Sequence, residues 1–145
     1  MSIPEKIRIL IADDHDMIRQ TWKLLLEQDP RFRVVAECNN SEQLMSLLKE
    51  NLPDIILMDI NIGPTNGFET TRLIMQQWPK ARIIGLSIND QAVYAKNLLV
   101  LGAKGYVTKD SSRYEMTDAI LEVMQGREYI CKDVRKAHRN FLFRK

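Results

Sequence analysis

The stretch Ile55-Ile56-Leu57-Met58-Asp59 places a carboxylate directly after four apolar residues. Pro53 precedes this run and a segment rich in turn formers, 61–67, follows it, which is typical of a strand buried on both faces. An ionised side chain at the end of such a strand is costly unless it is paired, bound to a metal or exposed at a functional edge. Asp59 therefore needs partners from elsewhere in the chain.

Other apolar runs also end in polar residues. These are Asp13 and Asp14 after 9–12, Ser87 after 82–86, and Lys109 after 105–108. If these strand ends meet at one edge of a sheet, three carboxylates, a hydroxyl and an ammonium share one pocket. Each residue also has an ordinary explanation on its own, because aspartates cap helices and lysines are usually solvated.

Strand-like and helix-like segments alternate along the chain. We expect strands at 7–12, 33–37, 54–59, 82–87 and 104–108, and helices at 16–28, from Asn40, from the 61–67 loop to Trp78, at 90–101, and from Ser112 to Gly126. Such alternation predicts a doubly wound α/β fold, in which a parallel sheet is covered by helices on both faces. Ligands of open parallel sheets bind beyond the carboxyl ends of the strands, where the polar residues lie.

The composition is that of an ordinary globular protein, with 145 residues, 45% hydrophobic and 28% charged. The first residues lack the charged start and apolar core of a signal peptide, and no apolar stretch has the length of a membrane span. We therefore expect a cytoplasmic protein without a membrane partner. Cys38 and Cys131 show no metal spacing, and we expect free thiols.

Charge divides the chain at about residue 126. Residues 127–145 carry seven Lys or Arg against two acidic residues, whereas 1–126 is mildly acidic. We expect one folded domain at 1–126 and a basic tail, or the start of a linker to a further domain, at 127–145. A short basic run is often only solvated, although it can contact nucleic acid.

Three clustered carboxylates repel one another unless a cation neutralises them, and Mg²⁺ prefers such oxygen ligands. With a cation, an ammonium and a hydroxyl around it, Asp59 can act as a nucleophile toward a phosphoryl group and form an aspartyl phosphate. His15 and His138 have no partner at metal-ligand spacing, and we expect both on the surface.

Together these residues resemble the receiver domain of bacterial two-component response regulators, over residues 7–126. The matching segments are Ala12-Asp13-Asp14-His15, Leu57-Met58-Asp59-Ile60, Ser87, and the run from Gly102 to Lys109. That last run and Gly126-Arg127-Glu128-Tyr129 are similar to the NarL/LuxR (FixJ) subgroup, whose members usually carry a C-terminal helix-turn-helix. The resemblance implies a flavodoxin-like fold with a five-stranded parallel sheet in the order 2-1-3-4-5.

The resemblance also implies roles around Asp59, the phosphoacceptor. Asp14 and Asp59 would bind Mg²⁺ with the backbone carbonyl of Asn61, and Asp13 would act mainly through a bound water. Ser87 and Lys109 would contact the phosphoryl oxygens. Tyr106 would be the switch aromatic, turning inward as Ser87 moves.

The implied function is that of a phosphorylation-dependent switch that catalyses only its own phosphotransfer and dephosphorylation. The phosphoryl donor would be a sensor histidine kinase. The output would be control of a DNA-binding domain. That domain would lie outside this chain, since the residues after Gly126 are too few for a helix-turn-helix. The receiver would form a homodimer on phosphorylation. A stand-alone single-domain regulator that acts through protein contacts is the alternative.

Some positions depart from the family pattern. Asp110 replaces a common proline, and Gly63 stands where a proline is usual, with Pro64 one residue later. Ile88 is bulky where a small residue is usual, which would narrow access to the phosphoryl site. A haloacid-dehalogenase-type phosphatase also uses an aspartate nucleophile and Mg²⁺, but it requires a second aspartate at the position of Asn61. A nucleotide- or flavin-binding module would require a glycine-rich first turn, which 13–16 lacks.

Overall fold

The apolar runs at 9–12, 55–58 and 83–86 form the centre of a parallel sheet in the computed structural model, which describes residues 5–136. The strands are β1 Ile7–Ala12, β2 Phe32–Cys38, β3 Ile55–Asp59, β4 Ile83–Ser87, β5 Gly105–Thr108 and β6 Tyr129–Ile130. The helices are α1 Asp16–Glu27, α2 Ser41–Glu50, α3 Gly67–Gln77, α4 Ala92–Val100 and α5 Arg113–Met124. All residues of β3, β4 and β5 are buried, as expected for strands covered on both faces.

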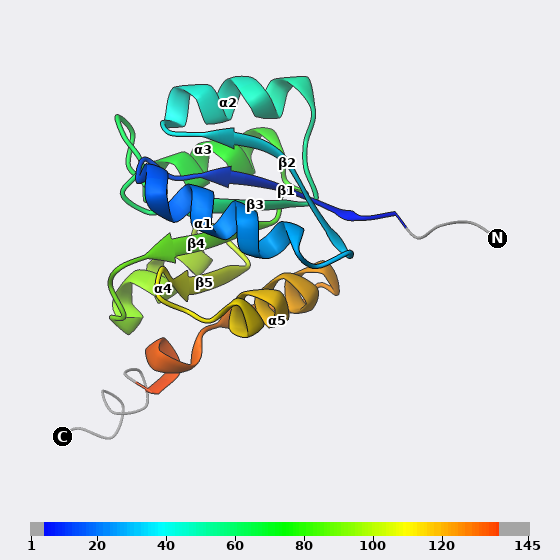
Figure 1. Cartoon of the computed structure of the whole chain (residues 1–145). Coiled ribbons are helices and arrows are strands. Elements are labelled where there is room, and N and C mark those ends of the chain that lie inside the picture. The colour runs from blue at the N-terminus through cyan, green and yellow to red at the C-terminus, as the bar shows by residue number, and fades with distance from the viewer. Residues whose placement is uncertain (1–4, 137–145) are drawn as a thin grey trace.

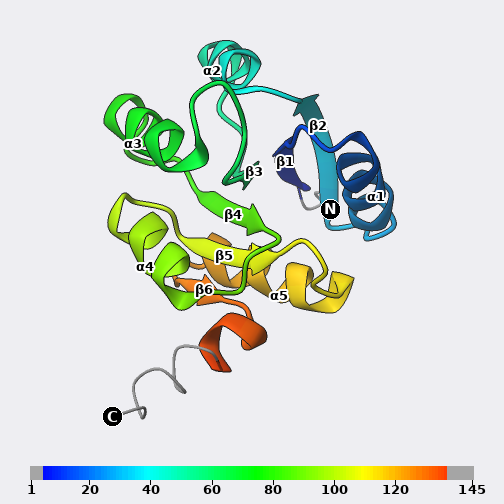
Figure 2. The same cartoon turned by 90° about the vertical axis from the view of Figure 1, so that its left-hand side faces the viewer.

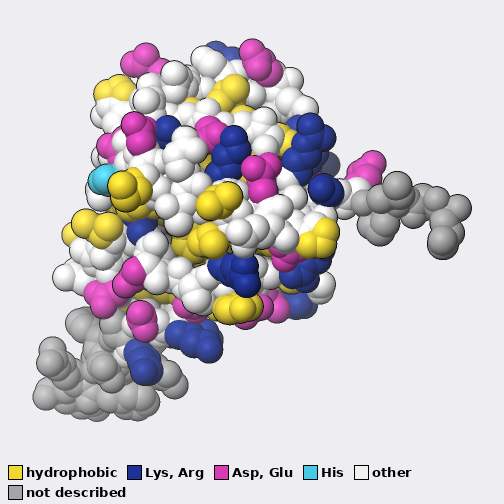
Figure 3. Space-filling view, in the orientation of Figure 1, with side chains coloured by type: hydrophobic (Ala, Val, Ile, Leu, Met, Phe, Trp, Pro, Cys, Tyr) yellow, Lys and Arg dark blue, Asp and Glu magenta, His cyan; other side chains and the backbone are white. Residues whose placement is uncertain are grey.

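Helices cover both faces of the sheet (Figures 1 and 2). Helices α1 and α5 lie on one face, and α2, α3 and α4 lie on the other. The apolar side of α1 packs inward through Trp22 and Leu26, while Met17 and Leu24 are exposed. The exposed hydrophobic side chains on the α1 and α5 face are interspersed with charged ones (Figure 3). The predicted doubly wound α/β architecture is confirmed.

Local capping explains where two of the helices begin. The side chain of Asn40 accepts a hydrogen bond from the Gln43 amide, and the side chain of Ser112 accepts one from the Glu115 amide. Both are N-cap bonds, which satisfy backbone donors in the first turn that have no partner within the helix. The Ser112 cap fixes the start of α5 directly after the short loop that carries Lys109.

The expected number of five strands was wrong, because β6 adds a sixth strand beside β5. The order is β2-β1-β3-β4-β5-β6, and all neighbours are parallel. The edge of β5 offers free backbone groups, and the segment after α5 pairs with them. The amide of Tyr129 donates to the carbonyl of Lys104, and that of Cys131 donates to the carbonyl of Tyr106, both at 3.0 Å.

The segment after β6 also packs on the body. Cys131 and Val134 are buried, and a short helical turn covers 132–136. The division expected at residue 126 stays a prediction, and residues 137–145 of the expected basic tail lie outside the described residues. Cys38 and Cys131 are both free, buried thiols. Among the described residues, no helix combines the length and apolar character needed to cross a membrane.

Candidate functional site

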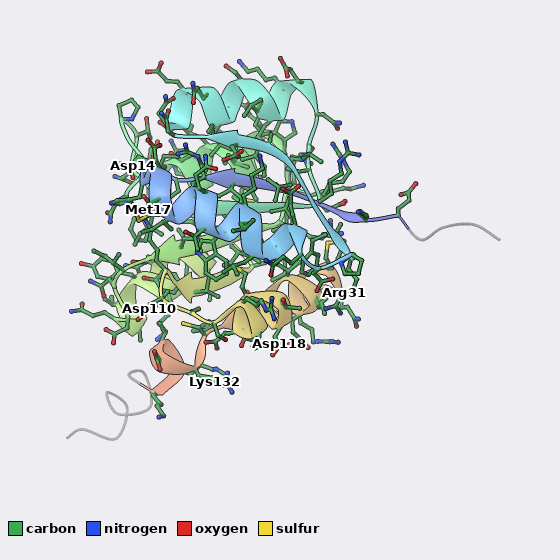
Figure 4. The ribbon with its side chains drawn as sticks, viewed as in Figure 1. Asp14, Met17, Arg31, Asp110, Asp118 and Lys132 are labelled. Atoms are coloured by element: carbon green, nitrogen blue, oxygen red, sulfur yellow. The ribbon has the colours of Figure 1, made fainter. Side chains whose placement is uncertain are left out.

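The polar residues that end the strands meet at one edge of the sheet. Asp59 is the last residue of β3 and Ser87 the last of β4, whereas Asp13 and Lys109 directly follow β1 and β5. The arrowheads of β1, β4 and β5 point to this edge in Figure 1, and Asp14 lies there in Figure 4. The structure thus brings together residues that lie up to 96 positions apart in the chain.

The ammonium of Lys109 joins two buried carboxylates. Its Nζ lies 3.1 Å from both carboxylate oxygens of Asp13 and 3.1 Å from Oδ2 of Asp59. The Lys109 side chain is only 4% exposed, and both aspartates are fully buried. Because charge interactions are screened less inside a protein than in water, the ammonium offsets the repulsion between the two buried carboxylates.

Each buried aspartate is also held by a backbone amide. Oδ1 of Asp13 accepts from the amide of His15 at 2.8 Å, and Oδ1 of Asp59 accepts from the amide of Asn61 at 2.9 Å. Oδ2 of each aspartate, by contrast, is buried and accepts no hydrogen bond from the described residues, because its ion pair with Lys109 does not have hydrogen-bond geometry there. Capping does not account for these aspartates, because His15 is the N-cap residue of α1 and no side chain caps it.

The carboxylate cluster suits a divalent cation. Asp14 is about half exposed, with 47% of its side-chain surface accessible, and it stands beside the buried pair. Single oxygens of Asp13, Asp14 and Asp59 and a nitrogen of His15 all lie within 4.8 Å of one another. Hard oxygen donors, including the two buried Oδ2 atoms that accept no hydrogen bond from the described residues, fit an ion such as Mg²⁺, which is bound by one or two carboxylates and keeps several waters.

Ser87 is linked to Tyr106 through one residue of the following loop. The Asn89 amide donates to the Ser87 hydroxyl at 2.9 Å, and the Tyr106 hydroxyl donates to the Asn89 carbonyl at 2.8 Å. The Tyr106 ring is completely buried, and this burial raises the pKa of Tyr106 to about 12. A movement of the Ser87 loop would therefore be felt directly by a core aromatic residue.

The loop after Asp59 is tied to the start of α2. The Ser41 amide and hydroxyl both donate to the carbonyl of Gly63, at 2.8 and 3.2 Å, and the Thr65 amide donates to the Ser41 hydroxyl at 3.2 Å. These bonds fix the loop that contains Gly63 and Pro64, where the sequence departs from the family pattern. Ile88 is 76% exposed, and its expected effect on access stays a prediction.

Comparison with known proteins identifies the family. A family model described as the response regulator receiver domain matches residues 9–121. The chain belongs to the response regulator receiver family. The receiver is 39% identical over 125 residues to the transcriptional regulatory protein DegU of Brevibacillus brevis, a match that covers 86% of this chain and 53% of DegU.

Further relatives place the receiver among regulators of the LuxR/NarL type. It is 30% identical to the response regulator GacA of Pseudomonas aeruginosa, a match that covers 88% of this chain and 60% of GacA. A crystal structure of a LuxR-family two-component response regulator from Aurantimonas sp. SI85-9A1 superposes with a TM-score of 0.89 at 32% identity, covering 95% of this chain and 99% of that one. The chain thus spans between half and two thirds of the length of these curated relatives.

Sequence reasoning missed one residue of the site. The ring of His15, which we expected only at the surface, is 54% exposed, but its Nδ1 lies 3.1 Å from Asp13 and 3.1 Å from Asp14. The same atom lies 2.8 Å from Nζ of Lys109. The signal in the sequence was its position directly after the aspartate pair. His138 lies outside the described residues.

Proposed function

We propose that this receiver takes a phosphoryl group from a phosphohistidine of a sensor kinase onto Asp59. In this step an oxygen of the Asp59 carboxylate attacks phosphorus, the phosphorus–nitrogen bond to the donor histidine breaks, and an aspartyl phosphate forms. The observation that carries the proposal is the buried Asp59 carboxylate, whose Oδ2 lies 3.1 Å from the Lys109 ammonium and accepts no hydrogen bond from the described residues.

Asp14 and Asp59 would hold Mg²⁺ directly, together with the backbone carbonyl of Asn61, and Asp13 would act mainly through a water. The ion would neutralise charge on the phosphoryl oxygens during transfer. The Asn61 carbonyl is a suitable donor because the Asn61 amide is already bonded to Asp59, which fixes the turn. Asp13 is suited to an indirect role because Lys109 already contacts both of its carboxylate oxygens.

Lys109 and Ser87 would have different tasks. Lys109 offers a charge to the phosphoryl group at the point where its ammonium now contacts Asp59. Ser87 offers a hydroxyl that can move toward the phosphate, and the Asn89 link passes this movement to Tyr106. Phosphorylation adds about two negative charges to the pocket and would favour one of two arrangements that already coexist. The surface formed by 87–109 would carry the signal.

The relatives suggest the output. DegU is named a transcriptional regulatory protein, and this chain covers about half of it. We infer that the receiver controls a DNA-binding domain outside the chain and forms a homodimer when phosphorylated. The receiver would act in the cytoplasm as a switch and not as an enzyme with an external substrate. A stand-alone regulator is the alternative, and the phosphatase alternative is weakened by Asn61, which is not an aspartate.

Phosphorylation with acetyl phosphate and Mg²⁺ tests the assignment. Intact-mass measurement should show one added phosphoryl group in the parent and in Asp110→Asn, and none in Asp59→Asn. Asp110 is a matched control because it is an exposed aspartate directly after Lys109 at the same edge (Figure 4). Undiminished phosphorylation of Asp59→Asn, or a phosphoryl group mapped to another residue, would overturn the proposal.

A second measurement tests the route of the switch. Hydrogen exchange is compared with and without beryllofluoride, which mimics a phosphoryl group on the acceptor. Changes in protection should concentrate in 87–109. Changes confined to α1 and α2 would show that another surface carries the signal.

A further inference from the structure

The nitrogen Nδ1 of His15 lies close to both hydrogen-bond acceptors and a hydrogen-bond donor. Carboxylate oxygens of Asp13 and Asp14 each lie 3.1 Å from it, and Oδ2 of Asp59 lies 3.7 Å away. The ammonium nitrogen Nζ of Lys109 also lies 2.8 Å from Nδ1. One nitrogen atom thus faces three anionic acceptors and one cationic donor.

No placement of a proton on His15 satisfies all these contacts. An ammonium has three donors and no acceptor, so its contact with Nδ1 is favourable only if Nδ1 carries a lone pair. That lone pair then points among carboxylate oxygens, which also carry lone pairs. With a proton on Nδ1, the contacts with Asp13 and Asp14 become favourable, but the contact with Lys109 sets two donors against each other.

A divalent cation removes the conflict, because Nδ1, Asp14 and Asp59 then donate to one positive centre, and Asp13 faces the same centre through a water. The spacing agrees with this. Ligand atoms that neighbour each other around an octahedral ion with bonds of about 2.1 Å lie about 3.0 Å apart. The distances from Nδ1 to Asp13 and to Asp14 are both 3.1 Å. The fully buried Oδ2 atoms of Asp13 and Asp59 accept no hydrogen bond from the described residues, and a single ammonium, that of Lys109, lies 3.1 Å from both, which leaves excess negative charge for a divalent ion to neutralise.

We propose that His15 is a nitrogen ligand of the divalent ion at this site, so that the site accepts imidazole-binding ions such as Ni²⁺ as well as Mg²⁺ and Mn²⁺. This inference rests on the proposed metal site of Asp14 and Asp59 and adds a ligand to it. Imidazole suits Ni, Zn and other transition metals, whereas Mg²⁺ prefers oxygen. His15 should therefore shift the preference of the site among metals.

Metal binding by His15 would also change the contacts of Lys109. Nδ1 can donate its lone pair either to the ammonium or to a metal ion. Loading the site therefore separates Lys109 from His15, and the Lys109 ammonium becomes available to a phosphoryl group.

Electron spin echo modulation of the Mn²⁺-loaded, unphosphorylated protein tests the inference. A directly bound imidazole gives a ¹⁴N modulation, which should be present in the parent and in His138→Leu, the control at the other histidine of the chain, and absent from His15→Leu. Calorimetric titrations should show that His15→Leu weakens Ni²⁺ binding by about tenfold or more, since even second-sphere changes cost 10–100-fold. Mg²⁺ binding should change much less. Thermal unfolding should show that His15→Leu is folded, because the His15 ring is half exposed and its replacement removes little buried surface.

The outcomes separate this inference from the site on which it rests. A parent spectrum without ¹⁴N modulation, a modulation that persists in His15→Leu, or an equal loss of Mg²⁺ and Ni²⁺ affinity would overturn the role of His15. Asp14→Asn tests the underlying site, because it should weaken binding of all these ions. If it leaves every affinity unchanged, the proposed metal site itself fails.

Discussion

The Tyr106 hydroxyl donates a hydrogen bond to the carbonyl oxygen of Asn89, at 2.8 Å, and so ties a buried ring of β5 to the loop after β4. The amide of the same Asn89 donates to the Ser87 hydroxyl. The side chain at the phosphoryl end of β4 and the core aromatic are therefore two hydrogen bonds apart. This link would be the physical basis of the proposed switch from Ser87 to the surface of 87–109.

Removing only the hydroxyl should loosen that link. Tyr106→Phe keeps the buried ring but leaves the Asn89 carbonyl without this donor, which should lower the free energy of unfolding by about 0.5–1.5 kcal/mol. Hydrogen exchange of 88–91 should become faster. Urea denaturation and exchange measurements check this, with Tyr114→Phe as the control because Tyr114 is exposed. Equal behaviour of the two variants would mean that the Tyr106 hydroxyl does not hold the loop.

Burial makes the fold sensitive to high pH. It raises the pKa of Cys38 from 9.0 to about 12, so the folded state keeps the thiol protonated when the unfolded chain has already ionised. The stabilisation is complete below pH 9.0 and is lost as pH rises toward 12. The slope is at most about 1.4 kcal/mol per pH unit for one group. Urea denaturation between pH 8 and 11 should show a free energy of unfolding that declines less steeply with pH in Cys38→Ala than in the parent. Parallel declines in the two proteins would contradict the role of Cys38.

The ion pair of Lys109 should carry much of the stability of the metal-free pocket. Lys109→Met leaves the buried carboxylates of Asp13 and Asp59 without their ammonium, and breaking a buried pair costs about 3–5 kcal/mol. In chelator this loss should appear in urea denaturation, and Mg²⁺ should stabilise the variant more than the parent. Lys104→Met, an exposed lysine next to the same strand, is the control. A loss no larger than that of Lys104→Met would show that the pair is dispensable.

Gly67 is required by a close approach of two backbone segments. Its amide donates to the Ile60 carbonyl at 2.7 Å, and a Cβ added there would lie 2.5 Å from the Ile60 Cα. Backbone atoms cannot move aside as the tip of a flexible side chain can. Gly67→Ala should therefore lower the free energy of unfolding by about 1–3 kcal/mol. Gly63→Ala in the same loop is the matched control, because a Cβ there meets nothing within 4 Å. Thermal unfolding should separate the two variants, and equal melting temperatures would contradict the clash.

The sequence predicted the alternating strands and helices because each buried strand is a continuous apolar run and the caps are local signals. Asn40 with Gln43 and Ser112 with Glu115 are three residues apart, so their hydrogen bonds can be expected from spacing alone. The juxtaposition of Asp13, Asp59 and Lys109 followed from the rule that parallel strands end at one edge.

Two features could not be predicted in this way. Strand β6 has two residues, Tyr129 and Ile130, too few to show a period, and it forms only because β5 has a free edge. The placement of His15 depends on the direction of a side chain after the strand has ended. Spacing along the chain does not report this direction, because the partners Asp59 and Lys109 come from strands far away in the sequence.

The carboxylate of Glu115 should hold β6 and the turn after it. Its Oε2 accepts from the Tyr129 hydroxyl at 2.9 Å and from the Lys132 amide at 2.8 Å, on either side of the buried Cys131. Hydrogen bonds to a charged group contribute about 1.5–3 kcal/mol. Glu115→Ala should therefore speed exchange of the Cys131 and Lys132 amides by about tenfold or more, since 1.4 kcal/mol is a factor of ten.

Thiol labelling gives a second readout of the same opening. Cys131 should react faster with a thiol reagent in Glu115→Ala, whereas Cys38, at the other end of the sheet order, should keep the parent rate. Asp118→Ala is the matched control, because Asp118 is an exposed acidic residue on the same helix (Figure 4). If Cys131 is labelled at the same rate in Glu115→Ala and in Asp118→Ala, the Glu115 carboxylate does not hold β6. Pairing of β6 with β5 and the burial of Cys131 and Val134 must then be sufficient to hold it.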